Sequence, residues 1–146
     1  MTACLFLLGD GPERAQNVAN ARKGESHNSI KFLGKQEQME DILPLADLFL
    51  LTSEYESFGL AALEAMAAEV PVISTNAGGL PEINIDGYSG YMSNVGDVDD
   101  MCKNALAILK DKPTHDSFKA NALAQAKKFD ISNIVPKYEK LYEGLL

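Results

Sequence analysis

The sequence has no tryptophan, only two cysteines and two histidines, and fewer basic than acidic side chains. Lys and Arg number 13 against 21 Asp and Glu, so the formal net charge is −8. Nucleic-acid phosphates and anionic membrane surfaces are bound by clustered Lys and Arg, so this balance argues against both kinds of partner. Cys4 and Cys102 are not spaced as metal ligands or as a redox pair, and we expect two buried thiols in a reducing compartment.

The chain also lacks a long hydrophobic run. No apolar segment approaches the roughly 20 residues that cross a bilayer, so we expect no membrane span. The first eight residues contain neither a basic region nor a small-residue cleavage site, so they do not indicate a signal peptide. With 146 residues, 46% of them apolar, the composition is typical of one acidic, cytoplasmic, globular domain that covers residues 1–146.

Short apolar runs alternate with helical patterns along the chain. We expect strands at 3–8, 30–33, 47–51, 70–74 and 91–92, and helices at 13–23, 39–46, 58–68, 97–110, 114–127 and 131–145. The run 3–8 is unbroken, which predicts a strand buried on both faces, and the helix 58–68 is apolar nearly all round, which predicts a buried helix. On the last helix we expect four side chains to serve packing: Tyr138, Leu141, Tyr142 and Leu145.

This alternation predicts an α/β fold, a Rossmann-like parallel sheet with helices on both faces. Open parallel sheets bind ligands beyond the carboxyl ends of their strands. Three loops rich in glycine and small polar residues leave that edge, at 9–11, 52–57 and 75–80. The functional site is therefore expected there.

The strongest candidate is the segment 56–64, ESFGLAALE. Gly59 lies where a helix starts, and unpaired backbone N–H groups and the helix dipole favour an anion such as a diphosphate there. The absence of a side chain at Gly59 would let a ligand approach the backbone. Glu56 lies just before the helix, at the mouth of the site. Glu64 lies inside an apolar helix, where its carboxylate needs partners, which two sugar hydroxyls or a structural Arg or Lys would supply.

Other patterns are less specific. Gly78-Gly79 predicts either a second backbone cradle or a tight turn, and Gly9-x-Gly11 lacks the third glycine of a dinucleotide fingerprint. The acidic run at 97–100 resembles a metal-binding pair of aspartates. However, acids at these positions fit a capped helix start at the positive end of the helix dipole, so we expect no metal there.

At these residues the chain resembles the retaining, two-domain GT-B glycosyltransferases of the group 1 type. Glu56, seven residues and Glu64 resemble the two-glutamate signature of that family. Six segments fall in the family's order: GDGPER at 9–14, IKFLG at 30–34, ADLF at 46–49, EAMA at 64–67, VPVI at 70–73 and GGLPE at 78–82. Within the family, segments 57–67 and 74–82 are most similar to enzymes that transfer N-acetylglucosamine to L-malate in bacillithiol synthesis.

The resemblance implies roles for particular residues. Glu56 would be the catalytic residue and would contact hydroxyls of the donor sugar near the reacting centre. Glu64 would accept hydrogen bonds from the ribose hydroxyls. The donor sugar and the distal phosphate would be held at the start of the same helix by Ser57, Phe58, Gly59 and Leu60.

A second segment would bind the rest of the donor. The resemblance implies that Leu33 and Lys35 line the nucleobase, with Gly9 and Gly11 beside them. It further implies a hexosyltransferase that takes a UDP-sugar, UDP-N-acetylglucosamine first, and a small acceptor such as L-malate. Transfer would retain the anomeric configuration and would use neither a metal nor another cofactor.

The resemblance also implies what this chain does not contain. The family builds its active site between two Rossmann-like domains, and the acceptor-binding domain lies N-terminal. The donor domain's first β-α unit, with the basic residues that meet the diphosphate, would precede residue 3. We therefore expect the 146-residue chain alone not to transfer sugar, and to self-associate through the seam that an absent central strand exposes. The alternative is a non-catalytic α/β module that binds a nucleotide or another phosphorylated ligand.

Overall fold

The computed structural model describes residues 3–24 and 27–145 of the protein. The chain divides into two compact units, Met1–Met39 and Glu40–Leu146, each of which is described by itself. Strands pair in parallel in both units. The predicted parallel α/β fold is confirmed by this arrangement, and the assignment of residues 1–146 to one domain stays a prediction.

The first unit is a small βαβ arrangement. Its elements are β1 (Leu5–Leu8), α1 (Arg14–Lys23), a 3-10 turn (His27–Ser29) and β2 (Ile30–Gly34). Leu5 pairs with Ile30 in parallel register. The prediction that the first strand is buried on both faces is wrong, because all four β1 side chains are exposed, Phe6 to 52%. The described sheet has two strands here and α1 buries no residue against it.

The second unit contains a three-stranded sheet in the order β3-β4-β5. Its elements, from the end of the first unit onward, are α2 (Met39–Ile42), a 3-10 turn (Leu43–Leu45), β3 (Phe49–Leu51), α3 (Leu60–Ala67), β4 (Val72–Thr75), α4 (Leu80–Ile83), β5 (Gly90–Ser93), α5 (Val98–Leu109), α6 (Lys112–Ala126), a 3-10 turn (Lys127–Phe129) and α7 (Ile131–Glu143). The helix expected at 39–46 tightens into the 3-10 turn where Pro44 cannot donate a helical hydrogen bond.

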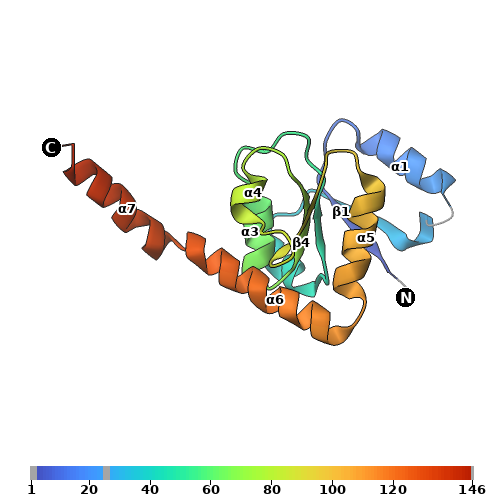
Figure 1. Cartoon of the computed structure of the whole chain (residues 1–146). Helices are drawn as coiled ribbons and strands as arrows, with labels where there is room; N and C mark the ends of the chain where they lie inside the picture. The colour runs from blue at the N-terminus through green and yellow to red at the C-terminus, as the bar shows by residue number, and fades with distance from the viewer. Residues whose placement is uncertain (1–2, 25–26, 146) are drawn as a thin grey trace. The chain divides into compact units, whose positions relative to one another are not determined.

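Helices cover both faces of the three-stranded sheet. Figure 1 shows α3 and α4 on one side of β4 and α5 on the other. The central strand β4 is buried along its whole length. Ile73 of β4 packs with Ile108 of α5 and Phe118 of α6, while α3 and α4 contribute a second set of fully buried side chains: Ala62, Ala65, Met66, Leu80 and Ile83. The core therefore fixes the carboxyl end of β4 and the start of α3.

Helix α3 is buried on one face only, so the prediction of a helix buried all round is wrong. Its buried residues recur at helical spacing, and the opposite face is exposed at Leu60, Ala61, Glu64 and Ala67. Helix packing requires one apolar stripe, and here small alanines supply most of it. The apolar residues on the other face of α3 are therefore not buried within this unit.

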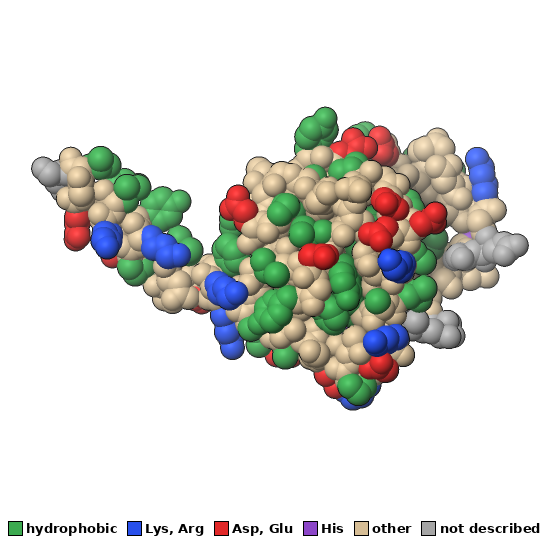
Figure 2. Space-filling view, in the orientation of Figure 1, with side chains coloured by type: hydrophobic (Ala, Val, Ile, Leu, Met, Phe, Trp, Pro, Cys, Tyr) green, Lys and Arg blue, Asp and Glu red, His purple; other side chains and the backbone are tan. Residues whose placement is uncertain are grey.

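Helix α7 also differs from expectation. The four side chains predicted to pack are all exposed, from 57% for Tyr138 to 76% for Leu145, and α7 contains no buried residue. Figure 2 shows apolar side chains along this helix. The apolar spacing is correct, but nothing in the described part of the unit covers it.

The two thiols are exposed, which contradicts the prediction that they are buried. Cys102 lies on α5, where Met101, Ala105 and Ile108 face the core at helical spacing. One residue corresponds to a rotation of about 100° around a helix, so Cys102 points away from that face. Among the described helices, none has the length and apolar character needed to cross a membrane.

Candidate functional site

Two of the three predicted loops meet at the carboxyl edge of the three-stranded sheet. The hydroxyl of Thr75, at the end of β4, donates to the carbonyl of Ser53 at 2.6 Å. The N–H of Gly79 donates to the carbonyl of Glu56 at 3.0 Å. The segment after β3 is thus attached to the segment after β4, at the edge where a parallel sheet binds its ligand.

Glu56 is held at the start of α3 by its own side chain. Its Oε1 accepts a hydrogen bond from the N–H of Gly59 at 3.1 Å, and the side chain is half-buried. A carboxylate at this position is favoured by the partial positive charge of the helix N-terminus. The Gly59 N–H, which we expected to be unpaired and open to a ligand, therefore donates to Glu56 instead. Of the other N–H groups of the first turn, those of Leu60 and Ala61 belong to exposed residues and that of Ala62 to a buried one.

Gly59 is required for a packing reason that the sequence did not predict. Its φ is 98°, a value that favours glycine, and the residue is buried. A Cβ atom there would lie 2.7 Å from Cδ2 of Leu80 and 3.3 Å from Cδ1 of Ile83. The absent side chain makes room for α4, and the approach of a donor to Gly59 stays a prediction.

The remaining residues of the signature lie just before α3 or on its exposed face. Ser57, Phe58 and Leu60 are exposed, and the Phe58 ring meets that of Phe129 edge-on at 6.0 Å between centroids. Glu64 is exposed one turn beyond Leu60. Burial therefore does not force a partner on the Glu64 carboxylate, and that part of the sequence argument is wrong. Its ribose contact stays a prediction.

The predicted nucleobase residues lie in the first unit. The N–H of Gly9 donates to the carbonyl of Gly34 at 2.8 Å, which joins the carboxyl ends of β1 and β2. The glycine segment and the Leu33 to Lys35 segment are therefore side by side, as expected from the sequence. Gly11, Leu33 and Lys35 are exposed. Their contact with a nucleobase stays a prediction.

The acidic run at 97–100 caps a helix, as predicted. Oδ1 of Asp97 accepts from the N–H of Asp100 at 3.1 Å at the start of α5. Oδ2 of Asp100 accepts from the Ser93 hydroxyl at 2.8 Å and from Nδ2 of Asn104 at 3.0 Å. Within the described ranges, no three His, Cys, Asp or Glu side chains gather as a metal site would require. The expectation of a metal-free reaction stays a prediction.

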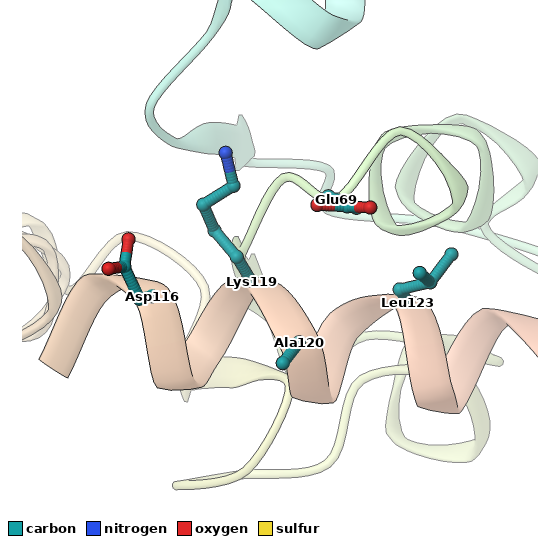
Figure 3. Close-up of a pocket in the computed structure, with 5 residues that line it drawn as sticks. All are labelled: Glu69, Asp116, Lys119, Ala120 and Leu123. Atoms are coloured by element: carbon teal, nitrogen blue, oxygen red, sulfur yellow. The ribbon is translucent and has the colours of Figure 1, made fainter. Parts of the chain in front are cut away.

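A cavity of about 400 Å³ lies at the opposite end of α3 from Glu56. It is lined by Glu69, Asp116, Lys119, Ala120 and Leu123. Figure 3 shows Lys119 and Leu123 rising from α6 on the side where Glu69 lies. None of the predicted site residues lines this cavity, so it is separate from the candidate site.

Comparison with known proteins identifies the family. Residues 2–125 match the model described as glycosyl transferases group 1. The chain belongs to this family. The family predicted from the Glu56 and Glu64 signature is confirmed. The match covers both units of the structure, from β1 to most of α6.

Individual relatives agree with the family. The chain is 39% identical to N-acetyl-alpha-D-glucosaminyl L-malate synthase of Bacillus anthracis, over 99% of this chain and 38% of that protein. It is 31% identical to 2-deoxystreptamine N-acetyl-D-glucosaminyltransferase of Niallia circulans, over 95% of this chain and 36% of that protein. The chain thus spans well under half the length of these group 1 relatives.

The same fold is also seen among solved structures. The chain superposes with a TM-score of 0.85 on Anabaena Alr3699/HepE, which was crystallised in complex with UDP. The two sequences are 24% identical, and the match covers 97% of this chain and 41% of that one. Similarity at this level shows the fold, and it confirms the predicted Rossmann-like architecture.

Proposed function

We propose that this group 1 chain binds the donor of a retaining glycosyltransferase. The donor is a UDP-sugar, UDP-N-acetylglucosamine first, and the acceptor of the whole enzyme is a small molecule such as L-malate. The observation that carries the proposal is the Glu56 carboxylate, held 3.1 Å from the Gly59 N–H at the start of α3. Two relatives whose names specify N-acetylglucosaminyl transfer support the choice of sugar.

The geometry of Glu56 suits a sugar contact. A carboxylate can accept about four hydrogen bonds, and the Gly59 N–H uses one of them. The remaining acceptor positions can receive hydroxyl groups of the donor sugar. Because the carboxylate is anchored at the helix start, it is oriented before the sugar arrives, which lowers the entropic cost of binding.

The first turn of α3 suits the diphosphate. Leu60 and Ala61 are exposed, and N–H groups in the first turn of a helix have no partner within the helix. The helix dipole adds to their attraction for an anion. As the donor bond breaks, these donors would stabilise the leaving diphosphate in the same way as an oxyanion hole.

Glu64 lies on the same helix at a distance that suits the ribose. Glu64 is the fourth residue after Leu60, which places it about 6 Å further along the helix axis. A donor whose distal phosphate meets the helix start would extend along α3 toward Glu64. Hydrogen bonds from two ribose hydroxyls to the exposed Glu64 carboxylate are therefore proposed.

Calorimetric titration of the 146-residue chain with UDP and with UDP-N-acetylglucosamine tests the proposal. We expect the unaltered chain to bind weakly, because no basic side chain is proposed to contact the diphosphate. The affinity of Glu64→Ala should be about tenfold lower or more, since hydrogen bonds to a charged group are lost. Glu139→Ala, an exposed glutamate on α7, is the matched control and should bind normally. Failure of the unaltered chain to bind either nucleotide would contradict the proposal. Binding that Glu64→Ala leaves intact would favour a module for another phosphorylated ligand.

A backbone substitution tests the helix start itself. Ala61→Pro removes one N–H group at the second helical position, and this chain already places Pro81 and Pro113 at the second positions of α4 and α6. Ala61→Ser is the control that keeps the N–H. We expect about fivefold weaker UDP binding for the proline variant alone, equivalent to one hydrogen bond. Equal affinity in both variants would exclude the Ala61 N–H as a phosphate ligand.

A further inference from the structure

The segment that follows β4 lies against the backbone of the segment that carries Glu56. Two hydrogen bonds join the segments, from the Thr75 hydroxyl to the Ser53 carbonyl at 2.6 Å and from the Gly79 N–H to the Glu56 carbonyl at 3.0 Å. One donor is the last residue of β4 and the other belongs to the segment after it, while both acceptors belong to the segment after β3. The two segments are therefore joined at two points.

The two segments are in direct backbone contact at Gly78. A Cβ atom at this position would lie 1.7 Å from the Glu56 carbonyl oxygen and 2.8 Å from its carbonyl carbon. The φ of Gly78 is 53°, so a side chain there would also strain the backbone. Any residue larger than glycine must displace Glu56, which makes this contact specific to the site.

The supporting segment is itself anchored in the core. Thr75 is 1% exposed and ends β4, the strand that is buried along its whole length. Leu80, directly after the two glycines, is fully buried, and its Cδ2 lies 2.7 Å from where a Cβ atom of Gly59 would be. Neither 52–57 nor 76–79 contains a helix or strand, but 76–79 is bounded on both sides by these buried residues of β4 and α4. The core therefore holds the segment after β4 at both ends, and that segment holds the one that carries Glu56.

We propose that Thr75, Gly78 and Gly79 are positioning residues for Glu56. They hold its backbone while the Gly59 N–H orients its carboxylate, so that the carboxylate meets the donor sugar in one geometry. The inference rests on the proposed donor-binding function. Contacts of this kind matter because functional groups must lie within about 0.5 Å of their productive position.

Removal of the Thr75 hydroxyl is the sharpest perturbation. Thr75→Val keeps the shape of the side chain and deletes its donor, while Thr75→Ser retains a hydroxyl. Ser89→Ala is the matched control, because Ser89 is 0% exposed and its hydroxyl donates to Asn84 at 3.1 Å at the opposite end of the sheet. A general loss of stability would affect the Ser89 variant as well.

The affinity readout is the ratio of the Kd for UDP to the Kd for UDP-N-acetylglucosamine, which isolates the contribution of the sugar. We expect Thr75→Val to reduce this ratio about fivefold, as for one lost hydrogen bond, with UDP affinity unchanged. Thr75→Ser should restore it and Ser89→Ala should leave it unaltered. An unchanged ratio in Thr75→Val, or an equal reduction in Ser89→Ala, would overturn the positioning role.

Amide hydrogen exchange supplies a readout that needs no ligand. If Thr75 positions Glu56, the Gly59 N–H loses protection in Thr75→Val and keeps it in Ser89→Ala. If the unaltered chain binds no UDP-sugar, the proposed function fails, and the exchange of Gly59 still decides the positioning role. Unchanged protection of Gly59 in Thr75→Val would refute it.

Discussion

Replacement of Glu69 with glycine should stabilise the protein without affecting the candidate site. Glu69 follows the C-terminal end of α3 and, among the described residues, is the one non-glycine residue with a positive φ, 61°. Its N–H donates to the Met66 carbonyl at 3.0 Å, and the N–H of Val70 donates to the Ala65 carbonyl at 2.9 Å. This pair of hydrogen bonds forms a Schellman motif, whose left-handed position is normally glycine.

The size of the effect follows from three contributions. A side chain in the left-handed conformation costs roughly 1–2 kcal/mol, which glycine avoids. Removal of a carboxylate from the negative end of a helix adds about 0.3 kcal/mol at an exposed position. Glycine gives back about 0.4–1 kcal/mol through its freedom in the unfolded chain. The net stabilisation is about 0.3–1.9 kcal/mol, and its central value near 1 kcal/mol corresponds to about 2–4 °C in Tm for a chain of this length.

Urea and thermal unfolding of the 146-residue chain, with Glu69→Ala as control, measure this effect. Alanine removes the charge and keeps the Cβ atom, so its stability should change by no more than a few tenths of a kcal/mol. Affinity for UDP-N-acetylglucosamine should not change, because Glu69 lies beyond the far end of α3 from Glu56. If glycine is no more stabilising than alanine at position 69, the left-handed strain inferred from φ is refuted.

Three further predictions concern pH, activity and association. The Thr114 N–H donates to the Asp111 carboxylate at 2.8 Å and lowers the pKa of this residue, which caps α6. The contribution of Asp111 to the free energy of unfolding is therefore complete above its unfolded pKa and is lost as the pH falls through its lower folded pKa. Urea unfolding below about pH 4 should therefore show a shallower loss for Asp111→Ala than for the unaltered chain. A sensitive transfer assay with UDP-N-acetylglucosamine and L-malate should detect no turnover by the 146-residue chain. Measurable turnover would contradict the expectation that this chain alone does not transfer sugar. Sedimentation should show concentration-dependent self-association that Phe6→Ser weakens and Tyr55→Ser, at a 93% exposed aromatic residue, does not.

Much of the fold could be predicted from the sequence because its elements are locally encoded. β2, β4 and β5 and the start of α5 lie where apolar runs, glycines and the Asp97 cap place them. Burial could not be predicted in the same way, because it depends on what covers an element. The apolar run of β1 and the apolar stripe of α7 have the expected pattern, yet both are exposed in the described chain.

The candidate site was predictable where it is local and unpredictable where it is not. The position of Glu56 at the start of α3 follows from three neighbouring residues, and the hydrogen bond to Gly59 confirms it. The role of Gly78 depends on contact with a residue 22 positions earlier. A tight turn and a ligand cradle both require glycine, so the sequence alone offered those two interpretations and not the contact with Glu56.

Gly59 shows why experiments must separate residues that contact the donor from residues whose packing shapes the site. A Gly59→Ala variant would meet Leu80 at 2.7 Å and would force an alanine into a φ of 98°. Its effect on donor binding would therefore report the packing of α3 on α4, even if no ligand touched that residue. Ala61 is exposed in the same first turn and contributes an N–H without a core contact at its side chain. The chemistry of the helix start is consequently testable at Ala61, while its geometry is determined by Gly59, Gly78 and the buried end of β4.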